Sequence, residues 1–398
     1  MIIGLVGKPN VGKSAFFRAL TLAAAESGNF PFTTIDANSA IGYVKIKDPA
    51  QHFDKSSNPR EGYVLGEYRF VPTEVIDVAG LVPGASEGKG LGNQFLNDLS
   101  QADALIHVID LSGSTNEKGE PVDLNSYDPA EDIKFLEVEL NQWYLNIIEK
   151  HWANIDKKIR MQDMKIEDAL ITVLSGLNIK ERHIFQAISE LKLDKTNISD
   201  NLKELASKLR EISKPMVIAA NKCDAIQNNN LWEEKLNKLK EQFPGYIIMP
   251  VIAEYEYNLK KAAEAEVISY IPGEKSFEIK DESKLNEAQI NGLNKIKDTI
   301  SSMPNGTGVQ DCINSAMFDL LKMIAICPGG VKLEDKNGNT LPDCFLMPQG
   351  TTALDFAFRL HTDFGKNFVK AIDIKTGRMV GKDHPVNMGD IIEIKAGK

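Results

Sequence analysis

The chain has 398 residues, of which 42% are hydrophobic and 26% charged, and its 56 Asp and Glu against 46 Lys and Arg give a formal net charge of −10. This is the composition of a globular protein of roughly two or three domains, and it excludes a disordered, collagenous or disulfide-rich chain. An acidic chain is not a general polyanion binder. We therefore expect no DNA partner, and any RNA contact must come from a local patch.

Cysteine spacing and hydropathy exclude further classes. The four cysteines form no CxxC pair or Cys/His cluster, so we expect reduced, buried thiols rather than a zinc site. The apolar start Met1–Val6 has no basic region before it and is interpreted as a strand, not a signal peptide. No apolar run approaches the ~18 residues of a membrane helix. The expected location is cytoplasmic, with no membrane partner.

The chain begins with a predicted strand, a glycine loop and a helix. Ile2–Val6 is a short apolar run, Ala15–Ala25 is rich in helix formers, and Gly7–Ser14 between them reads GKPNVGKS. This matches G-x-x-x-x-G-K-S in the context that the motif requires, where backbone N–H groups and a helix N-terminus bind phosphate. We expect Lys13 to contact the β- and γ-phosphates and Ser14 to ligate Mg²⁺. The residues assigned to this phosphate site are Asn10, Val11, Gly12, Lys13, Ser14 and Ala15.

Three further apolar runs end in polar residues. They are Glu74–Asp77, Ala104–Asp110 and Met216–Ala220, the last followed by Asn221. Buried strands separated by helical stretches indicate a parallel α/β sheet with helices on both faces, whose ligands bind at the carboxyl ends of the strands. His107 lies inside one of these runs, and we interpret it as a core histidine with satisfied hydrogen bonds rather than a base.

Two segments are expected to complete the metal side of the site. Asp77-Val78-Ala79-Gly80 matches D-x-x-G, in which Asp77 would hold Mg²⁺ through water and the Gly80 N–H would bind the γ-phosphate. The segment Phe30–Ile35 must supply a threonine to the Mg²⁺ shell in the triphosphate state, with Thr33 and Thr34 as candidates.

Asn221-Lys222-Cys223-Asp224 is the predicted base-reading segment. The Asp224 carboxylate can accept hydrogen bonds from guanine N1–H and N2–H₂, a donor pair that adenine lacks. Asn221 would reach N7, and the Lys222 stem would lie over the base. GTP is therefore the favoured nucleotide.

The hydropathy pattern changes in two other parts of the chain. Between Asp128 and Ile212, apolar residues recur at spacings of three and four, which predicts an antiparallel helical hairpin inserted in the sheet domain. From about Ile324 to Lys398, short β-rich runs alternate with turns around one helical piece, Thr352–Leu360, which predicts a small separate domain.

The motifs together resemble a known family. GKPNVGKS, the run Asp77–Leu96 and NKCD are similar to the Obg-related translation-factor GTPases, and more narrowly to the archaeal-type members of the YchF subfamily. The tail is similar to a TGS domain, chiefly through Met347–Ala357 and His361–Lys366. The resemblance implies a P-loop GTPase domain of residues 1–127 and 213–323, a coiled-coil-like helical insert of residues 128–212, and a β-grasp TGS domain of residues 324–398.

The resemblance also bears on individual residues. It implies Thr34 as the magnesium ligand of the first switch, and GTP as the nucleotide, although relatives with an altered NKxD prefer ATP. A later Ser-Ala pair in such proteins contacts the base. Here Ile252 replaces the serine, and the backbone N–H of Ala253 is the expected contact to guanine O6.

The means of hydrolysis is the least obvious feature. Leu81 stands where many GTPases place the glutamine that orients water, and its side chain makes no hydrogen bond. The resemblance implies Asn10 as a ligand of a potassium ion beside the phosphates, and a turn-forming role for Asn10 is the alternative. The glycine-rich segment Gly84–Gly92 is interpreted as a switch, with a plain surface loop as the alternative.

These expectations describe an Mg²⁺-dependent GTPase with Lys13, Thr34, Gly80 and Asn10 as catalytic residues, stimulated by K⁺ or by a ribosomal partner. A nucleotide-gated ribosome- or RNA-binding module with negligible turnover is one alternative, and an ATPase is another. The resemblance implies contact with the ribosome or structured RNA. Nearby basic residues could form a face for it, with ordinary solvated surface as the alternative; they are Lys366, Lys370, Lys375, Arg378 and Lys382.

Overall fold

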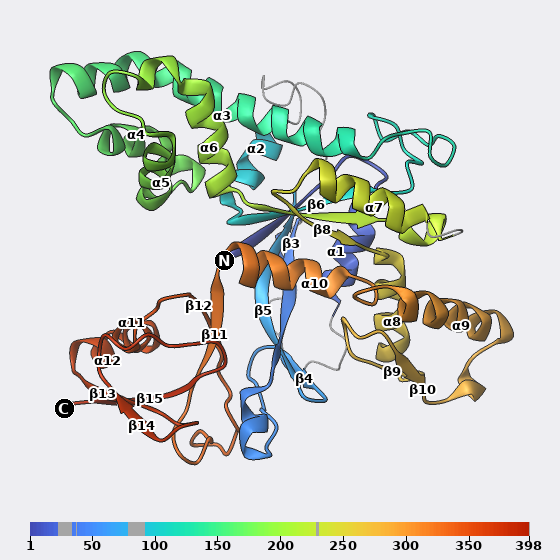
Figure 1. Ribbon diagram of the computed structural model, residues 1–398. Coiled ribbons are helices and arrows are strands. Elements are labelled where there is room, and N and C mark those ends of the chain that lie inside the picture. The colour runs from blue at the N-terminus through green and yellow to red at the C-terminus, as the bar shows by residue number, and fades with distance from the viewer. Residues whose placement is uncertain (23–33, 37, 79–91, 228–230, 398) are drawn as a thin grey trace.

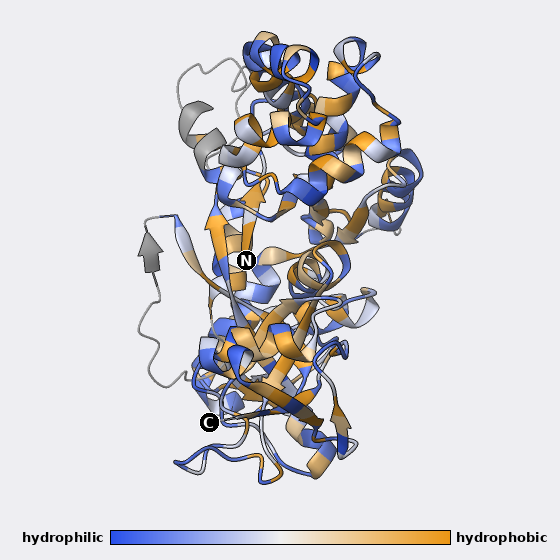
Figure 2. Ribbon diagram, turned by 90° about the vertical axis from the view of Figure 1, so that its left-hand side faces the viewer, coloured by the Kyte–Doolittle hydropathy of each residue, from blue (hydrophilic) through white to orange (hydrophobic). Residues whose placement is uncertain are grey.

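The computed structural model describes residues 1–22, 34–36, 38–78, 92–227 and 231–397. A helical region, a central sheet and a smaller C-terminal sheet follow one another along the molecule (Figure 1, Figure 2). This arrangement confirms the predicted α/β class with an inserted helical region and a C-terminal β-rich domain.

Within the described residues the central sheet has eight strands, of which seven follow the order β2-β3-β5-β1-β6-β7-β8, while β4 pairs with β5. Strands β5, β1, β6, β7 and β8 are parallel, and β2, β3 and β4 add antiparallel pairs at one side. The strands are β1 (Ile2–Val6), β2 (Thr34–Asp36), β3 (Ser39–Lys47), β4 (Tyr63–Leu65), β5 (Tyr68–Asp77), β6 (Ala104–Asp110), β7 (Met216–Asn221) and β8 (Ile247–Pro250).

The apolar runs form strands because both faces of the parallel region are covered. On β6, Ile106 and Val108 face a core that includes helix α1, whereas Leu105 faces the core that includes the helical insert. All three side chains are fully buried. A strand buried on both faces needs a continuous apolar run rather than an alternating one, which is why β1 and β6 have the bounds that the sequence predicted.

Helices cover both faces of the central sheet, and a further helical region with a small hairpin lies beside it. A short hairpin, β9 (Ile268–Tyr270) and β10 (Phe277–Ile279), follows helix α8. The helices are α1 (Lys13–Thr21), α2 (Gly92–Gln101), α7 (Leu231–Gln242), α8 (Ala253–Glu264), α9 (Glu287–Ser302) and α10 (Val309–Asn314), which continues as a π-helical turn at Ser315–Leu320.

The insert is helical as predicted, but the expected hairpin is wrong. Residues 128–212 are all described, and they form the long helix α3 (Ala130–Met161) followed by α4 (Ile166–Leu174), α5 (Glu181–Leu191) and α6 (Leu202–Ser213). The apolar period runs almost unbroken from α3 into α4, so it concealed the break between them. Asp163 adopts a left-handed backbone there, with φ 51°.

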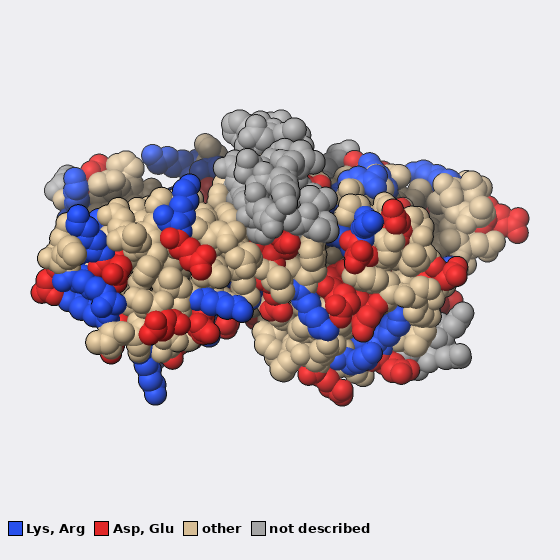
Figure 3. Space-filling model, turned by 90° about the horizontal axis from the view of Figure 1, so that it is seen from above, with Lys and Arg blue, Asp and Glu red and all other residues tan. Residues whose placement is uncertain are grey.

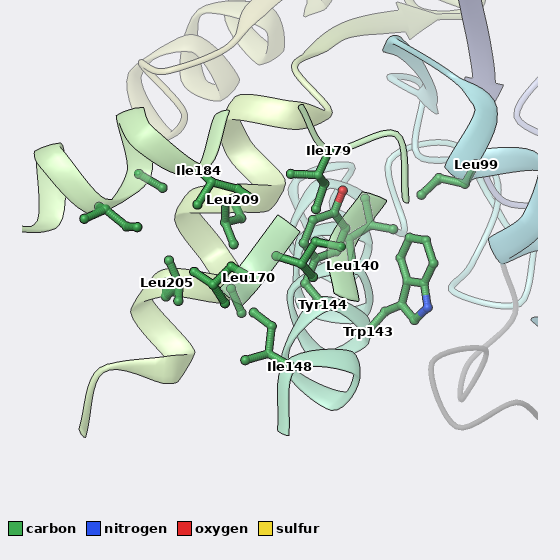
Figure 4. Close-up of a cluster of buried hydrophobic side chains, with 14 of the residues drawn as sticks. Leu99, Leu140, Trp143, Tyr144, Ile148, Leu170, Ile179, Ile184, Leu205 and Leu209 are labelled. Atoms are coloured by element: carbon green, nitrogen blue, oxygen red, sulfur yellow. The ribbon is translucent and has the colours of Figure 1, made fainter. Parts of the chain in front are cut away.

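The insert and the sheet share one hydrophobic core. Side chains from α3, α4, α5 and α6 converge on one another and reach Leu99 of α2 (Figure 4). The same cluster includes Val6, Leu105 and Met216 of the sheet. The strands are among the most hydrophobic ribbons of the molecule (Figure 2). Part of α3 packs against them, and its far end extends beyond the sheet to α4 and α5 (Figure 1).

The C-terminal domain is a five-stranded mixed sheet in the order β12-β11-β15-β13-β14, with two helices. Its helix α12 was not predicted as a separate element. The elements are β11 (Met323–Pro328), β12 (Phe345–Pro348), α11 (Ala353–Leu360), α12 (Thr362–Lys366), β13 (Phe368–Asp373), β14 (Arg378–Val380) and β15 (Ile391–Ala396).

A loop of this domain contacts the outer part of the central sheet. We call residues 329–343, between β11 and β12, the docking loop, and residues 48–69, around β4 and the start of β5, the arm. The Arg69 side chain, 1% exposed, donates to the carbonyls of Leu341 (2.6 Å) and Pro342 (3.1 Å). The backbone N–H of Arg60 donates to the Pro342 carbonyl at 3.0 Å. The arm and the docking loop are therefore held by hydrogen bonds, by ion pairs such as Arg60–Asp335, and by a small apolar cluster that includes Ala50 and Leu341.

Candidate nucleotide-binding site

The phosphate-binding loop joins β1 to α1 at the carboxyl edge of the sheet. Gly12 has φ +94°, and a Cβ atom there would lie 2.2 Å from Asn221 Nδ2, so only glycine fits. Helix α1 begins at Lys13, and no described side chain caps its first turn. The free N–H groups and the positive end of the helix dipole make this turn suited to an anion.

Lys13 and Asp77 meet beside this turn. Lys13 Nζ donates to Asp77 Oδ1 and to the Val78 carbonyl, the latter at 2.9 Å. The contact arises because Leu5 of β1 pairs with Asp77 of β5, so both strands end at the same level. The structure thus brings together two of the predicted site residues from positions 64 apart in the chain.

The donor set fits magnesium. Ser14 is exposed in the first turn of α1, next in sequence to Lys13, and Asp77 is partly exposed. A hydroxyl and a carboxylate are the hard oxygen ligands that Mg²⁺ accepts, usually together with water and nucleotide phosphate. Among the described residues, no group of three His, Cys, Asp or Glu side chains could hold a metal by itself.

Other predicted members of this region lie outside the described residues. Gly80, Leu81 and the glycine-rich segment up to Leu91 are among them, as is Thr33. Thr34 is described only as the first residue of β2, opposite Ala40 of β3. Their assigned roles remain predictions.

Asn221 connects the phosphate-binding loop to the base-reading side. Its Nδ2 donates to the Val11 carbonyl at 2.9 Å, and its Oδ1 accepts from the Ala253 N–H at 3.1 Å. Asn221 is 4% exposed and ends strand β7. Both ends of its amide are therefore occupied by protein, and the Ala253 N–H that was expected to face guanine O6 also bonds to Asn221.

Lys222 is held by a buried aspartate that the sequence analysis did not assign to the site. Lys222 Nζ lies 2.9 Å from Asp110 Oδ2. Asp110 also accepts hydrogen bonds from the hydroxyls of Ser112, Ser114 and Thr115. Burial would raise the pKa of Asp110, but these hydrogen bonds and the Lys222 charge outweigh it, so the pKa is lowered. Asp110 stays charged and fixes the lysine stem.

Asp224 follows Lys222 in a short 3₁₀ turn, Cys223–Ile226, and is half-buried. Burial is the main cause that raises its pKa, against an opposing contribution from Lys295. A carboxylate that is partly desolvated gains more from two donors than an exposed one does. This placement suits the predicted pairing with guanine.

Asn10 has a left-handed backbone, with φ 63°, and its Nδ2 donates to the Gly119 carbonyl at 2.9 Å. Gly119 belongs to the loop after β6, and a Cβ there would lie 2.5 Å from the Pro9 carbonyl oxygen. Because the amide nitrogen is used in this contact, Oδ1 is the atom left to bind a cation. The geometry is compatible with both interpretations of Asn10.

Two buried groups near the site were missed or misjudged. Lys8, 6% exposed, pairs with Asp132 of α3 and lies 3.8 Å from the centre of the Tyr127 ring. No sequence pattern links position 8 to position 132.

His107 is a core residue as expected. Its Nδ1 has no hydrogen-bond partner among the described residues, so the prediction that its hydrogen bonds are satisfied was wrong. Burial, with the Lys8 charge, lowers its pKa to about 3.

A phosphate-binding loop after β1, an aspartate ending β5 and an N-K-x-D segment after β7 define a P-loop GTPase domain. Family comparisons agree: a 50S ribosome-binding GTPase family matches residues 2–143, an Obg-like GTPase YGR210-like, G4 motif-containing domain matches residues 219–329, and a TGS domain matches residues 328–396. The chain belongs to the YchF subfamily of Obg-like GTPases.

Individual relatives span nearly the whole chain. An uncharacterized GTP-binding protein of Methanocaldococcus jannaschii is 47% identical over 99% of this chain and 98% of its own length. The ribosome-binding ATPase YchF of Buchnera aphidicola is 30% identical over 94% of this chain and 88% of its own. The crystal structure of a GTP-binding protein from Pyrococcus horikoshii is 37% identical, covers 100% of both chains and superposes with a TM-score of 0.79.

None of the helices in the described ranges combines the length and apolar character that crossing a membrane requires.

Proposed function

We propose that this protein binds GTP with Mg²⁺, hydrolyses it to GDP and phosphate, and acts in the cytoplasm as a switch on the ribosome. The observation that carries the proposal is the pair of hydrogen bonds made by Asn221. They tie Val11 of the phosphate-binding loop and Ala253 to the strand that presents Asp224. One nucleotide can therefore contact the phosphate loop and the base-reading aspartate together.

Each residue of the site has a separate role that follows from its position. Lys13 and the first turn of α1 bind the β- and γ-phosphates, and Lys13 exchanges its contact with Asp77 for the phosphates. Ser14, Thr34 and Asp77 would hold Mg²⁺, which neutralises phosphate charge when bound. The Gly80 N–H is assigned to the γ-phosphate, and Asn10 Oδ1 to a potassium ion beside it. Since Leu81 offers no hydrogen bond to water, turnover is expected to be slow without K⁺ or a partner.

The choice of GTP rests on Asp224. The M. jannaschii relative is named for GTP binding, while the B. aphidicola relative is named an ATPase. An adenine ring would leave the half-buried Asp224 carboxylate without donors, at about 1–3 kcal/mol. This chain retains the complete Asn221-Lys222-Cys223-Asp224 segment, which favours guanine.

The ribosome is proposed from the name of the bacterial relative. On the face seen in Figure 3, basic and acidic side chains alternate over the described residues without one dominant sign. A general attraction to RNA is not expected from this face, so recognition would depend on local shape and pairing.

The test is hydrolysis of GTP and ATP by the purified protein, in K⁺ and in Na⁺ buffers, with and without ribosomes. Mg²⁺-dependent GTP turnover that exceeds ATP turnover supports the proposal. Preferred ATP turnover would replace it with an ATPase. Tight GTP binding with no turnover in any condition would replace it with a nucleotide-gated binding module.

A further inference from the structure

Cys327 and Cys344 lie opposite each other on neighbouring strands. Ile326 of β11 pairs with Phe345 of β12 in antiparallel register. Cys327 follows Ile326 and Cys344 precedes Phe345, so the same register places the two cysteines side by side. Residues directly opposite in an antiparallel pair have Cβ atoms about 4.5–5.5 Å apart, which is near the range that a disulfide spans. Both cysteines are free, and the two thiols interact closely enough to shift each other's pKa.

The pair stands at the base of the docking loop, one cysteine at each end. Cys327 is fully buried in a small cluster with Leu333 and Leu341 of the docking loop, and Ala50 of the arm belongs to the same cluster. Arg69 Nη1, which holds the Leu341 carbonyl, lies 3.8 Å from Cys327 Sγ. A bond between the cysteines would therefore act on the contact between the C-terminal domain and the arm.

The two thiols differ in access and acidity. Cys344 is half-buried, whereas Cys327 has no exposed surface. Their mutual interaction lowers the pKa of Cys344 and, together with burial, raises that of Cys327. The Arg69 charge lowers the pKa of both. Cys344 is therefore the attacking thiolate and Cys327 the resolving thiol.

We propose that Cys327 and Cys344 form a redox site whose reversible disulfide closes the docking loop at its base. The oxidant is a small disulfide, RSSR, such as oxidised glutathione. The Cys344 thiolate attacks one sulfur of RSSR, the S–S bond breaks, and RS⁻ leaves and takes up the proton that Cys344 released. Cys327 then attacks Cys344 Sγ and displaces the second RS⁻, which is protonated in turn. Two thiols are oxidised and RSSR is reduced to two RSH.

Closure would restrict the docking loop at its base. Residues 328–343 would be bounded by a covalent link at one end of the sheet, where backbone pairing now holds them. When the docking loop is detached from the arm, a disulfide that joins its two ends reduces the number of conformations it can adopt. Oxidation should therefore slow detachment of the docking loop from Arg69 and Arg60. This site is independent of the nucleotide chemistry.

The experiment uses the full-length, folded protein. Reduced protein is incubated with oxidised glutathione, remaining thiols are blocked, and the chain is digested with trypsin for mass spectrometry. The disulfide would join the peptide 323–332 to the peptide 337–359. We expect this linked pair to form under native conditions, to disappear on reduction, and to be accompanied by slower native trypsin cleavage after Lys332 and Lys336.

Variants separate the two steps. Cys327→Ser should stop the reaction at a glutathione adduct on Cys344, and Cys344→Ser should give neither adduct nor link. Cys223→Ser and Cys312→Ser are the controls, since both thiols are fully buried and lie on other elements, the turn after β7 and helix α10, and the link should form in each. The proposal is overturned if the folded wild-type protein keeps all its thiols, if the link forms only after unfolding, or if Cys327→Ser yields no adduct on Cys344.

Discussion

Lys8 of the phosphate-binding loop and Asp132 of the first helix of the insert form a buried ion pair, with Nζ and Oδ1 2.8 Å apart. Side-chain exposure is 5% for Lys8 and 6% for Asp132. Lys8 Nζ also donates to the Thr115 carbonyl at 3.0 Å. The phosphate-binding loop is thereby bonded directly to α3. A movement of α3 should therefore shift the position of this loop.

Removing this lysine should destabilise the protein in a pH-dependent way. Lys8→Met leaves the Asp132 charge buried without its partner, a loss of about 3–5 kcal/mol in the free energy of unfolding at pH 8. Burial raises the pKa of Asp132 to about 6 despite Lys8, and without Lys8 it should rise further. A raised carboxyl pKa favours folding below the unfolded value of 3.8 and loses that contribution as pH rises through the folded value.

The loss caused by Lys8→Met should therefore be smaller at pH 5, where Asp132 can take up a proton, than at pH 8. Urea unfolding at both pH values, without nucleotide, measures it. Lys134→Met is the matched control, because Lys134 pairs with Glu131 on the exposed side of the same helix and its loss should change little. Equal losses at the two pH values would contradict this account of Asp132.

Replacing Lys13 should stop turnover. Lys13→Ala removes the charge beside the first turn of α1, and we expect GTP hydrolysis to fall by about 10²-fold or more. Arg18→Ala is the control, since Arg18 is exposed on the same helix and stacks on Tyr257, 5.1 Å from its ring centre. Steady-state phosphate release at saturating GTP is the measurement. Near-normal turnover in Lys13→Ala would place the active site elsewhere.

The specificity of Asp224 can be inverted. Asp224→Asn replaces an acceptor by a donor, which no longer matches the guanine N2–H₂ group but matches the carbonyl at the same position of xanthine. We expect GTP affinity to fall by about a hundredfold and XTP affinity to rise. Competition of GTP, XTP and ATP against a fluorescent nucleotide measures this. Unchanged selectivity in the variant would show that Asp224 does not read the base.

Asn10 can be tested as a ligand apart from its role in the turn. Asn10→Gly keeps the left-handed backbone, for which glycine has no steric penalty, but removes Oδ1. If Asn10 binds potassium, the stimulation of GTP hydrolysis by K⁺ over Na⁺ should disappear in this variant. If Asn10 only forms the turn, the stimulation should persist. The ratio of GTP hydrolysis rates in K⁺ and Na⁺ measured for the wild-type protein is the reference.

The sequence predicted features that depend on local pattern. The apolar runs of β1 and β6 gave both strands their observed bounds, because burial on both faces favours a nearly continuous apolar run. That Lys13 and Asp77 share one site followed from two motifs at the carboxyl edge of a parallel sheet, although their direct contact was not predicted. The Lys8–Asp132 pair did not, since it depends on how α3 crosses the loop. The break at Asp163 was also hidden, because an apolar period of 3.6 continues through a turn of suitable length.

The core shared by the insert and the sheet limits how this protein can be divided or moved. Val6, Leu105 and Met216 are covered by side chains of the same cluster as Leu140 and Tyr144 of α3. Excising residues 128–212 would expose these strands to water, so the truncated sheet should aggregate rather than fold. A partner that displaces the insert would therefore also displace the strands that carry the nucleotide-binding loops.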